Sequence, residues 1–518
     1  MRGSVKVVLL EPNQTDFQWI SDRIRSLLDA LGMGVDIRPA NAQLGRPEAI
    51  FDQEVVDIFV TDISLGTRSS FQGLDFIQLV KSKWPDIFAI AITSSELTFR
   101  QAAARIPTFD LLIHKAYLND EEYSKHLAKQ LGERFRRNVN VELDEDLSSL
   151  SAAHQRGQQR IALERVLRAV TFGSHSASAD ASVTRVVLKP LEGGFSRSKV
   201  YRMSSFGPNG VQFMNAVLKL SDPRHAQREI ENYLSFVKWY LPYTWRVELV
   251  GTSMTNQFGA LCYSFAYNDD IPFTSLADSI RRRNDQQIEA AMRMIFAPDH
   301  KRWYDANNVR DEVNIGRYYQ GRWFTAKQRD PADSFRDALP EERVFRDPNF
   351  VAINRYEYPW PSNFLFGRAH GDFKSCIRHG DLHAGNILVT ASNDLSFIDF
   401  QETGRGHIFD DFVSLETSIR LDYGLNDPTK CTEDFFNLLE NELLLARGHE
   451  NSLPYGSLVA QIREYAIGNF GSTDFSRYIY ALAALSYRLI GKQIIPAGSK
   501  RRLAACVLAS IRRLRDAQ

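Results

Sequence analysis

The sequence is poor in cysteine for its length and has no long apolar run. Its 518 residues include four cysteines, which lie far apart and form no C-x-x-C pair. A disulfide framework is therefore not expected, and reduced thiols in a cytoplasmic setting are. No apolar stretch reaches the length of a membrane span, and the N-terminus lacks the apolar core and cleavage site of a secretory signal. We expect a soluble cytoplasmic protein with no membrane partner.

The chain also lacks an excess of charge of either sign. Lysine plus arginine and aspartate plus glutamate each number 63. A net charge of zero gives no overall field that would attract nucleic acid or an anionic membrane, so nucleic acid is not an expected partner. Apolar content of 44% and charged content of 24% are ordinary for a globular protein. The length exceeds what one core can organise, so two or three domains are expected.

The most informative stretch is RHGDLHAGNILVTASNDLSFIDF, residues 378–400. A polar loop precedes two short apolar runs that predict a β-hairpin, and a lone carboxylate follows the second run. Phosphoryl transfer from a nucleotide needs one carboxylate near the attacking hydroxyl and oxygen ligands that hold magnesium against the phosphates. Asp381 fits the first role, and Asn386 and Asp399 fit the second.

Two other interpretations of the polar residues in this stretch are a metal site and simple turn caps. His379 and His383 are four residues apart, as in a helical zinc pair, but Gly380 and Gly385 argue against a helix and the zincin glutamate is missing. The aspartates and the asparagine could also simply cap turns. Phosphoryl transfer is the preferred interpretation because residues suited to all three roles lie around one predicted hairpin in a single short stretch.

This stretch closely resembles the catalytic loop and metal-binding aspartate of the aminoglycoside phosphotransferase and choline kinase families, relatives of the protein kinases. The resemblance implies an α+β bilobal protein-kinase-like domain that uses ATP and Mg²⁺. It implies that Asp381 receives the proton of an acceptor hydroxyl and that Asn386 and Asp399 hold the metal. The acceptor itself is left unspecified.

A small lobe is expected over residues 185–267. Three predicted strands surround the turn LEGGFSRS, in which Gly193, Gly194 and Ser196 would let backbone N–H groups approach phosphate oxygens. Lys219 lies inside the apolar strand AVLKL, where an ammonium group is costly without an anionic partner.

The same family resemblance implies that Lys219 contacts the nucleotide phosphates and pairs with a glutamate on the following helix. The predicted helix, residues 227–241, offers Glu229 and Glu231 on different sides. We favour Glu229, and Glu231 remains the alternative.

The large lobe is expected over residues 268–518 and contains a helical insertion before the catalytic loop. The insertion is rich in charged and aromatic residues, which is more typical of an aromatic-lined core than of a nucleotide or RNA site. After the catalytic loop, Asp410 and Asp411 precede a predicted helix, and Asp411 is interpreted as structural.

Residues 1–137 alternate between short apolar strands and amphipathic helices. Strands are expected at 5–10, 55–61, 88–92 and 111–113, with helices at 17–31, 73–83, 99–105 and 120–135. This alternation predicts a doubly wound α/β domain, whose ligands bind beyond the carboxyl ends of the strands. The residues at those ends are Glu11, Asp62, Thr93 and Lys115.

This domain resembles the receiver domain of bacterial response regulators. The resemblance implies that Asp62 is the phosphoacceptor, that Thr93 and Lys115 contact the phosphoryl oxygens, and that Glu11 helps to hold magnesium. It also implies a role in signal transduction with a histidine kinase as upstream phosphodonor. The second acidic position of the family is Pro12 here, so whether Asp62 is phosphorylated stays open.

The two parts are joined by a predicted linker over residues 138–184. It begins with an acidic stretch, continues with apolar residues at helical spacing from Ile161 to Val170, and ends in a small polar run. The helix could pair with a second copy of the chain, although packing against its own chain is the preferred interpretation.

Two functions follow from these expectations. In the first, the protein is an ATP- and magnesium-dependent phosphotransferase acting on a hydroxyl acceptor and regulated by the receiver-like domain. In the second, the kinase-like domain binds nucleotide without useful turnover and acts as a signalling or scaffold module with protein partners.

Overall fold

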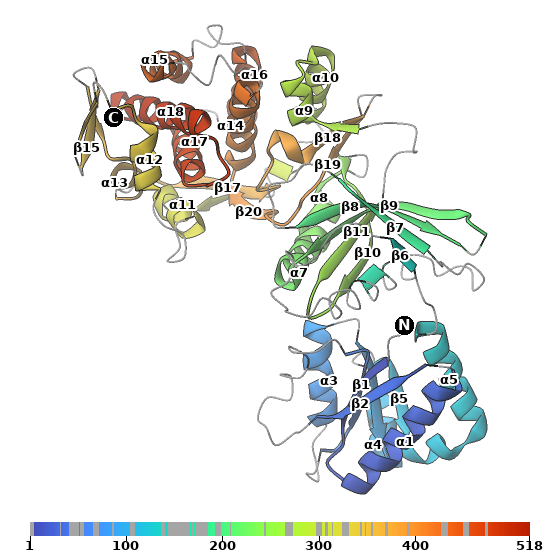
Figure 1. Cartoon of the computed structure of the whole chain (residues 1–518). Coiled ribbons are helices and arrows are strands. Elements are labelled where there is room, and N and C mark those ends of the chain that lie inside the picture. The colour runs from blue at the N-terminus through green and yellow to red at the C-terminus, as the bar shows by residue number, and fades with distance from the viewer. Residues whose placement is uncertain are drawn as a thin grey trace. The chain divides into compact units, whose positions relative to one another are not determined.

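A computed structural model of the chain divides into two compact units. The first contains Met1–Ile230 and Glu248–Ala266, and the second contains Glu231–Val247 and Tyr267–Gln518 (Figure 1). The structure describes residues 5–31, 33–40, 51, 56–65, 72–84, 87–103, 109–135, 140–142, 163, 166–167, 170, 185–191, 198–207, 209–242, 245–264, 273–296, 303–305, 309–312, 314–323, 331–341, 344–347, 349–353, 356–367, 371–390, 394–425, 434–448, 455–471 and 475–517.

The N-terminal part of the first unit is a five-stranded parallel sheet in the order β2-β1-β3-β4-β5. Its elements are β1 (Val5–Leu10), α1 (Gln14–Ala30), β2 (Val35–Pro39), β3 (Ile58–Asp62), α3 (Gln72–Lys83), β4 (Phe88–Thr93), α4 (Glu96–Ala103), β5 (Leu111–His114), η2 (Lys115–Asn119) and α5 (Glu121–Phe135). This is the doubly wound α/β architecture that the alternating pattern predicts.

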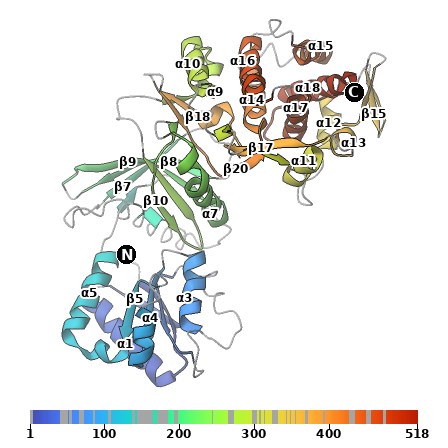
Figure 2. The same ribbon diagram turned by 180° about the vertical axis from the view of Figure 1, so that it is seen from behind.

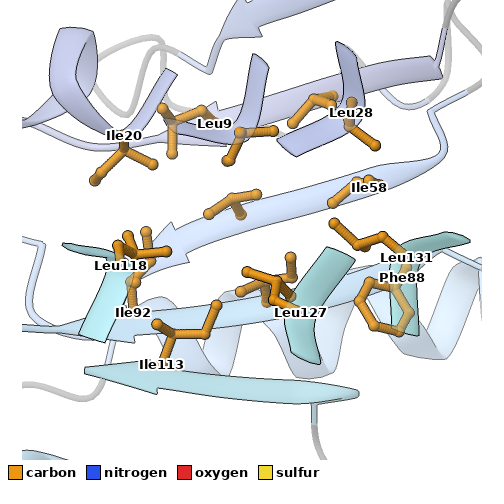
Figure 3. Packing of buried hydrophobic residues seen from close by; sticks show 14 of the residues in the cluster. Leu9, Ile20, Leu28, Ile58, Phe88, Ile92, Ile113, Leu118, Leu127 and Leu131 are labelled. Atoms are coloured by element: carbon orange, nitrogen blue, oxygen red, sulfur yellow. The ribbon is translucent and has the colours of Figure 1, made fainter. Parts of the chain in front are cut away.

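Both faces of this sheet are covered, because successive side chains of a strand point to opposite faces. In β1, Val7 and Leu9 join the cluster formed with α1 and α5, which Figure 3 shows around Leu28 and Leu127. Val8 and Leu10 instead join the cluster on the other face, with residues of α3 and α4. Burial on both faces explains why these strands are almost uniformly apolar in sequence.

The edge strand β2 was not predicted from the sequence. It reads VDIRP and is only partly buried, so it lacks the apolar run that marks the central strands. Its register, from Val5↔Val35 to Leu9↔Pro39, is set by pairing with β1. Proline is tolerated there because it ends a strand at the sheet edge.

The rest of the first unit contains a six-stranded sheet in the order β10-β11-β9-β8-β7-β6. The strands are β6 (Asn140–Glu142), β7 (Arg185–Pro190), β8 (Lys199–Phe206), β9 (Gln212–Ser221), β10 (Leu249–Met254) and β11 (Gly259–Ser264), and only β6 pairs with its neighbour in parallel.

The region predicted as a linker differs from that expectation in one respect and agrees with it in another. Its first residues form the edge strand β6 and are not simply a connection. Farther along, the helical residues Leu163, Val166, Leu167 and Val170 are buried in the same cluster as the strands of the six-stranded sheet. In this structure the apolar stripe therefore packs against its own chain.

A helix follows β9 directly. It begins as α7 (Pro223–Asn232), passes through a π-helical turn, η4 (Tyr233–Val237), and ends as α8 (Lys238–Tyr240). Gly259 at the start of β11 admits Ala226 of α7, since a Cβ at Gly259 would lie 2.1 Å from the Ala226 Cβ. Both views show α7 beside the sheet (Figure 2).

The second unit combines helices with three small sheets, in the orders β12-β18-β19, β13-β17-β20 and β14-β15-β16. Its elements are β12 (Phe273–Ser275), α9 (Leu276–Arg281), α10 (Asp285–Ile295), β13 (Arg310–Glu312), α11 (Ile315–Trp323), α12 (Ala332–Ala338), β14 (Val344–Arg346), β15 (Phe350–Ile353), β16 (Tyr356–Pro359), α13 (Pro361–Phe366), β17 (Phe373–Arg378), η8 (Ala384–Asn386), β18 (Ile387–Thr390), β19 (Leu395–Phe397), β20 (Gly404–His407), α14 (Asp410–Leu425), α15 (Phe435–Ala446), α16 (Gly456–Ala466), η11 (Ile467–Gly471), α17 (Phe475–Ile490) and α18 (Ala497–Asp516).

A buried ionic cluster joins the helices of this unit. Glu416 of α14 accepts hydrogen bonds from Arg463 of α16 and Tyr478 of α17, and Arg420 bonds both Glu416 and Glu442. Burial alone would raise the pKa of Glu416, but Arg463 and Arg420 lower it to about 2. The carboxylate is therefore charged at neutral pH and ties three helices together. Among the described helices, none has the length and apolar character needed to span a membrane.

Candidate active site

The polar loop and the lone aspartate meet at one end of the β18–β19 hairpin. The strands are antiparallel with Ile387 opposite Phe397, so the residues just before β18 and just after β19 lie at the same end. Ile398 N donates to Asn386 O at 3.1 Å and fixes this end of the hairpin. Asn386, in η8, and Asp399, two residues after β19, are thereby brought to one edge.

Asp381 is held by its backbone and not by its carboxylate. Its carbonyl oxygen accepts from His383 N at 2.9 Å and from Asn386 Nδ2 at 2.9 Å. No described residue donates a hydrogen bond to the Asp381 carboxylate, which is partly exposed. Asn386 Nδ2 is occupied by this contact, so the amide oxygen is the atom that Asn386 can offer to another group.

Asp399 has an unusual backbone conformation. Its φ is +66°, in the left-handed region that non-glycine residues rarely adopt. Such positions carry a cost and cluster at functional sites. A carboxylate here and the amide oxygen of Asn386 are the hard oxygen donors that Mg²⁺ prefers, and Mg²⁺ in kinases usually takes one or two carboxylates plus phosphate oxygens and water. In the described part of the chain, no three His, Cys, Asp or Glu side chains gather around one metal position.

Asp411, at the start of α14, fixes the loop that precedes Asp381. Its carboxylate accepts from His379 N at 2.8 Å, from Gly380 N at 2.7 Å and from Tyr304 Oη at 2.8 Å. Gly380 has φ +87°, and a Cβ there would lie 2.1 Å from Glu402 O, so only glycine fits. The structural role expected for Asp411 is thus a direct brace on the loop that leads to Asp381.

His379 connects this loop to the strand that leads to Asp399. The ring is buried, and Nε2 donates to Ile398 O at 3.0 Å. Burial lowers the pKa of His379, although the charges of Asp411, Asp381 and Asp399 oppose this, so the ring is neutral. His383 Nδ1 instead accepts from Gly385 N at 3.1 Å. The two histidines have separate structural contacts, which agrees with rejecting a helical zinc pair.

Arg378 is a second brace that sequence reasoning missed. Its Nε lies 2.8 Å from an oxygen of Asp410, and Nη1 donates to Glu402 O at 2.9 Å. Tyr318 and Tyr319 of α11 also donate to Asp410, at 2.6 and 2.8 Å. Burial opposes the charge of Arg378, but Tyr318 and the two aspartates hold its pKa above the ordinary value. The sequence offered one signal, the position of Arg378 directly before His-Gly-Asp; the tyrosines offered none.

In the first unit, Lys219 of β9 pairs with Glu229 of α7. Lys219 Nζ lies 2.7 Å from Glu229 Oε2, and both side chains are buried. Tyr263 Oη donates to the other oxygen of Glu229 at 2.8 Å. Of the two glutamates considered for Lys219, Glu229 is the one in contact. Gly193, Gly194 and Ser196 of the predicted phosphate turn lie outside the described residues.

A separate cluster lies at the carboxyl ends of the parallel strands. Lys115 Nζ contacts Asp62 at 2.8 Å, Glu11 at 3.0 Å and Asp16 at 2.6 Å. Burial opposes the charge of Lys115, but these three carboxylates raise its pKa. Burial raises the pKa of Glu11 in turn, against the effects of the Asn13 N–H and Lys115. Three of the four predicted strand-end residues are thus in one cluster.

Thr93 and Asp16 complete the picture of this domain. Thr93 is buried at the end of β4, where its hydroxyl accepts from Ser95 N at 3.2 Å, and it is not one of the residues that contact Lys115 Nζ. Sequence reasoning missed Asp16, because Asn13 caps α1 and an acidic residue in the first turn of a helix is common without any further role. Pro12 has no carboxylate, but Asp16, four residues later, places one 2.6 Å from Lys115 Nζ.

Comparison with protein families gives two matches. Residues 298–434, which include the hairpin and Asp411, match the phosphotransferase enzyme family. Residues 183–334, which include Lys219 and Glu229, match a family described as ternary complex associated domain 9. The first match supports a phosphotransferase-like domain in the C-terminal part of the chain. A search of curated proteins finds no match.

Several solved kinases are similar in part. An aminoglycoside phosphotransferase from Streptomyces rimosus is 15% identical with a TM-score of 0.33, over 64% of this chain and 98% of that one. An ethanolamine kinase from Plasmodium vivax is 13% identical with a TM-score of 0.28, over 63% and 83%. A choline kinase from Streptococcus pneumoniae is 10% identical with a TM-score of 0.29, over 63% and 94%. Likeness at this level does not identify an acceptor.

Proposed function

We propose that this protein transfers the γ-phosphoryl group of ATP to a hydroxyl acceptor. The observation that carries the proposal is the edge of the β18–β19 hairpin, where Asn386 and Asp399 meet and Asp381 keeps its carboxylate without a hydrogen bond from any described residue. The match of residues 298–434 to the phosphotransferase enzyme family supports the same reaction class.

Asp381 would orient the acceptor hydroxyl and receive its proton as the oxygen attacks phosphorus. A carboxylate suits this role when it lies within hydrogen-bond reach of the hydroxyl and is not already occupied by donors. Asn386 and Asp399 would hold Mg²⁺, which neutralises phosphate charge when bound. The brace by Asp411 and the neutral ring of His379 would keep the loop in one geometry, since a small displacement of a catalytic group costs much of the rate.

Lys219 would contact the nucleotide phosphates, and Glu229 would hold Lys219 in place. The support is the buried ion pair at 2.7 Å, reinforced by Tyr263. The ammonium group of a lysine carries three N–H donors, so it can bond a carboxylate and phosphate oxygens at the same time. Gly193, Gly194 and Ser196 remain the proposed backbone contacts to those phosphates.

The test is a labelled-phosphate transfer assay on the full chain with ATP, Mg²⁺ and mixed hydroxyl acceptors. Asp381→Asn should reduce transfer by roughly 10²–10⁴-fold, the usual contribution of a general base, while ATP still binds. Exposed Glu289→Gln on α10 is the matched control and should transfer like the wild type. Transfer that survives Asp381→Asn at the wild-type rate would remove this mechanism.

We further infer that the N-terminal domain is a receiver-like regulatory module in which Asp62 accepts a phosphoryl group from a histidine kinase. The strand order 2-1-3-4-5 is that of flavodoxin-like doubly wound sheets, and Lys115 contacts Asp62 at 2.8 Å. A small donor such as acetyl phosphate, followed by intact-protein mass spectrometry, tests the inference. A phosphoryl adduct should form in the wild type and be absent in Asp62→Asn; no adduct under any condition would mean a degenerate module.

A second candidate function is a nucleotide-binding module without useful turnover, acting in a multi-protein assembly. The match of residues 183–334 to a family named for association with a ternary complex favours it. The two candidates differ in one measurement. If no small molecule or protein in a lysate gains labelled phosphate although ATP binds, the module is a scaffold.

A further inference from the structure

An arginine of α11 contacts both the loop before Asp381 and the buried tryptophan next to it in the sequence. Arg322 of α11 donates from Nη2 to Gly380 O at 3.1 Å, one residue before Asp381. Its guanidinium also lies 5.8 Å from the ring centre of Trp323, which is buried. Trp323 is therefore positioned close to the catalytic loop.

A second guanidinium contacts the same tryptophan. Arg488 of α17 lies 5.1 Å from the ring centre of Trp323. Its Nε is buried and has no hydrogen-bond partner, and neither has Trp323 Nε1. Within the described residues, the Arg488 guanidinium forms no ion pair, although a cation partly withdrawn from water is costly unless an anion neutralises it.

The charges around Arg488 agree with this geometry. Burial lowers the pKa of Arg488, while the carboxylates of Asp381, Glu402 and Asp410 raise it. Burial and the charge of Arg488 lower the pKa of Lys492, which is exposed just after α17, and Asp381 and Glu402 again oppose the shift. The charges of Asp381 and Glu402 thus act on both cations, neither of which forms an ion pair within the described residues.

We propose that Arg488, which contacts Trp323, and the nearby Lys492 bind a negatively charged group of the acceptor, so that the substrate is a hydroxyl compound carrying a carboxylate or a phosphate. This rests on the proposed function, since it assigns the acceptor of that same site. The planar fork of Arg488 suits bidentate contact with a carboxylate or phosphate, and Lys492 adds a mobile point charge. Arg322 is a positioning residue, because its Nη1 and Nη2 groups are already engaged by Tyr318, Asp410 and Gly380.

Matched two-carbon alcohols separate the charge of the acceptor from its size. Glycolate, ethylene glycol and ethanolamine place a hydroxyl group beside a carboxylate, a second hydroxyl and an ammonium group respectively. Glycerol 3-phosphate, a three-carbon alcohol, offers a phosphate in place of the carboxylate. Calorimetric titration of the full chain with ADP and Mg²⁺ present should detect glycolate or glycerol 3-phosphate and neither of the other two. The anion that binds more tightly shows whether the acceptor carries a carboxylate or a phosphate.

Arg488→Ala should lower the affinity for that anion about tenfold or more, as expected for loss of a hydrogen bond to a charged group. Arg488→Lys should recover part of the affinity, and Lys492→Ala, at an exposed position, should weaken it severalfold without risk to folding. Exposed Arg293→Ala on α10 is the control and should bind like the wild type.

Anion affinity equal to that of ethanolamine, or unchanged in Arg488→Ala and Lys492→Ala, would overturn the assignment. So would weaker ADP binding in Arg488→Ala with anion binding intact, because the cation would then belong to the nucleotide site. These outcomes leave Asp381-dependent transfer untouched. Conversely, loss of the proposed reaction would appear as transfer that is insensitive to Asp381→Asn, whatever the anion titration gives.

Discussion

Asp411→Asn is the sharpest test of how the catalytic loop is held. The wild-type carboxylate accepts from His379 N, Gly380 N and Tyr304 Oη at 2.7–2.8 Å, and all three contacts are buried or partly buried. Asparagine keeps one acceptor oxygen and presents N–H groups at the other position, so at least one backbone N–H is left unsatisfied. With 1.5–3 kcal/mol for a hydrogen bond to a charged group and a further 1–3 kcal/mol for a stranded donor, we expect a loss of about 3 kcal/mol or more.

A loss of that size should lower the Tm of the transition that reports the second unit by roughly 6–12 °C, at about 2–4 °C per kcal/mol. Tyr304→Phe removes only one of the three donors and should cost about half as much or less. The assay is differential scanning calorimetry of the full chain, with labelled-phosphate transfer measured on the same samples at a temperature where every variant is folded. Transfer should fall in the same order as Tm, because the loop that carries Asp381 loses its brace. If Asp411→Asn unfolds within about 2 °C of the wild type, the brace is not what holds the loop.

Three further predictions concern buried charges. Glu229→Leu should cost roughly 3–5 kcal/mol, because it removes the anion that lies 2.7 Å from the buried Lys219 ammonium, and adding Lys219→Met should recover most of that loss. A double-mutant cycle of these two changes in urea measures the coupling, and additive effects would contradict the pairing. Because the folded-state pKa of His379 is lowered, its contribution to stability is complete above the ordinary value of 6.5 and is lost as the pH falls through the folded pKa. Between pH 7 and 5 the Tm of the wild type should therefore fall faster than the Tm of His379→Gln. Parallel falls in Tm would refute the neutral ring. Lys115→Met should destabilise the N-terminal domain by leaving three adjacent carboxylates without a cation, and adding Asp16→Asn should restore part of the loss; if the second change makes the domain less stable still, Asp16 is not held by Lys115.

The sequence predicted the elements whose pattern is local. Strands β1, β3, β4 and β5 are apolar runs because both of their faces are buried, and the catalytic hairpin is marked by two such runs around a polar turn. The edge strands were not predicted, because a strand that is not buried on both faces needs no apolar run. β2 and β6 expose polar residues and exist through pairing with a neighbour, which no short-range pattern encodes.

The candidate sites show a similar division. Asp381, Asn386 and Asp399 could be proposed because all three lie within a short stretch whose spacing carries chemical meaning. Asp16, Arg378, Tyr318 and Tyr319 could not, because their contacts with Lys115 and Asp410 join residues far apart in sequence. Arg488 is an extreme case. It lies in an apolar helix more than a hundred residues from Asp381, and its relevance follows only from its contact with Trp323.

The pattern of contacts around the loop separates supporting residues from the reacting one. Arg378, His379 and Gly380 are held by ion pairs or hydrogen bonds to Asp410, Asp411 and Ile398, whereas the Asp381 carboxylate accepts no hydrogen bond from the described residues. Replacing a support should therefore lower stability and transfer together. Asp381→Asn removes a charge that contributes no hydrogen bond to the fold, so it should leave Tm unchanged or slightly raised while transfer is lost, as expected where a site trades stability for activity. A large fall in the Tm of Asp381→Asn would mean that Asp381 is another structural carboxylate, and the assignment of the proton acceptor would have to move elsewhere.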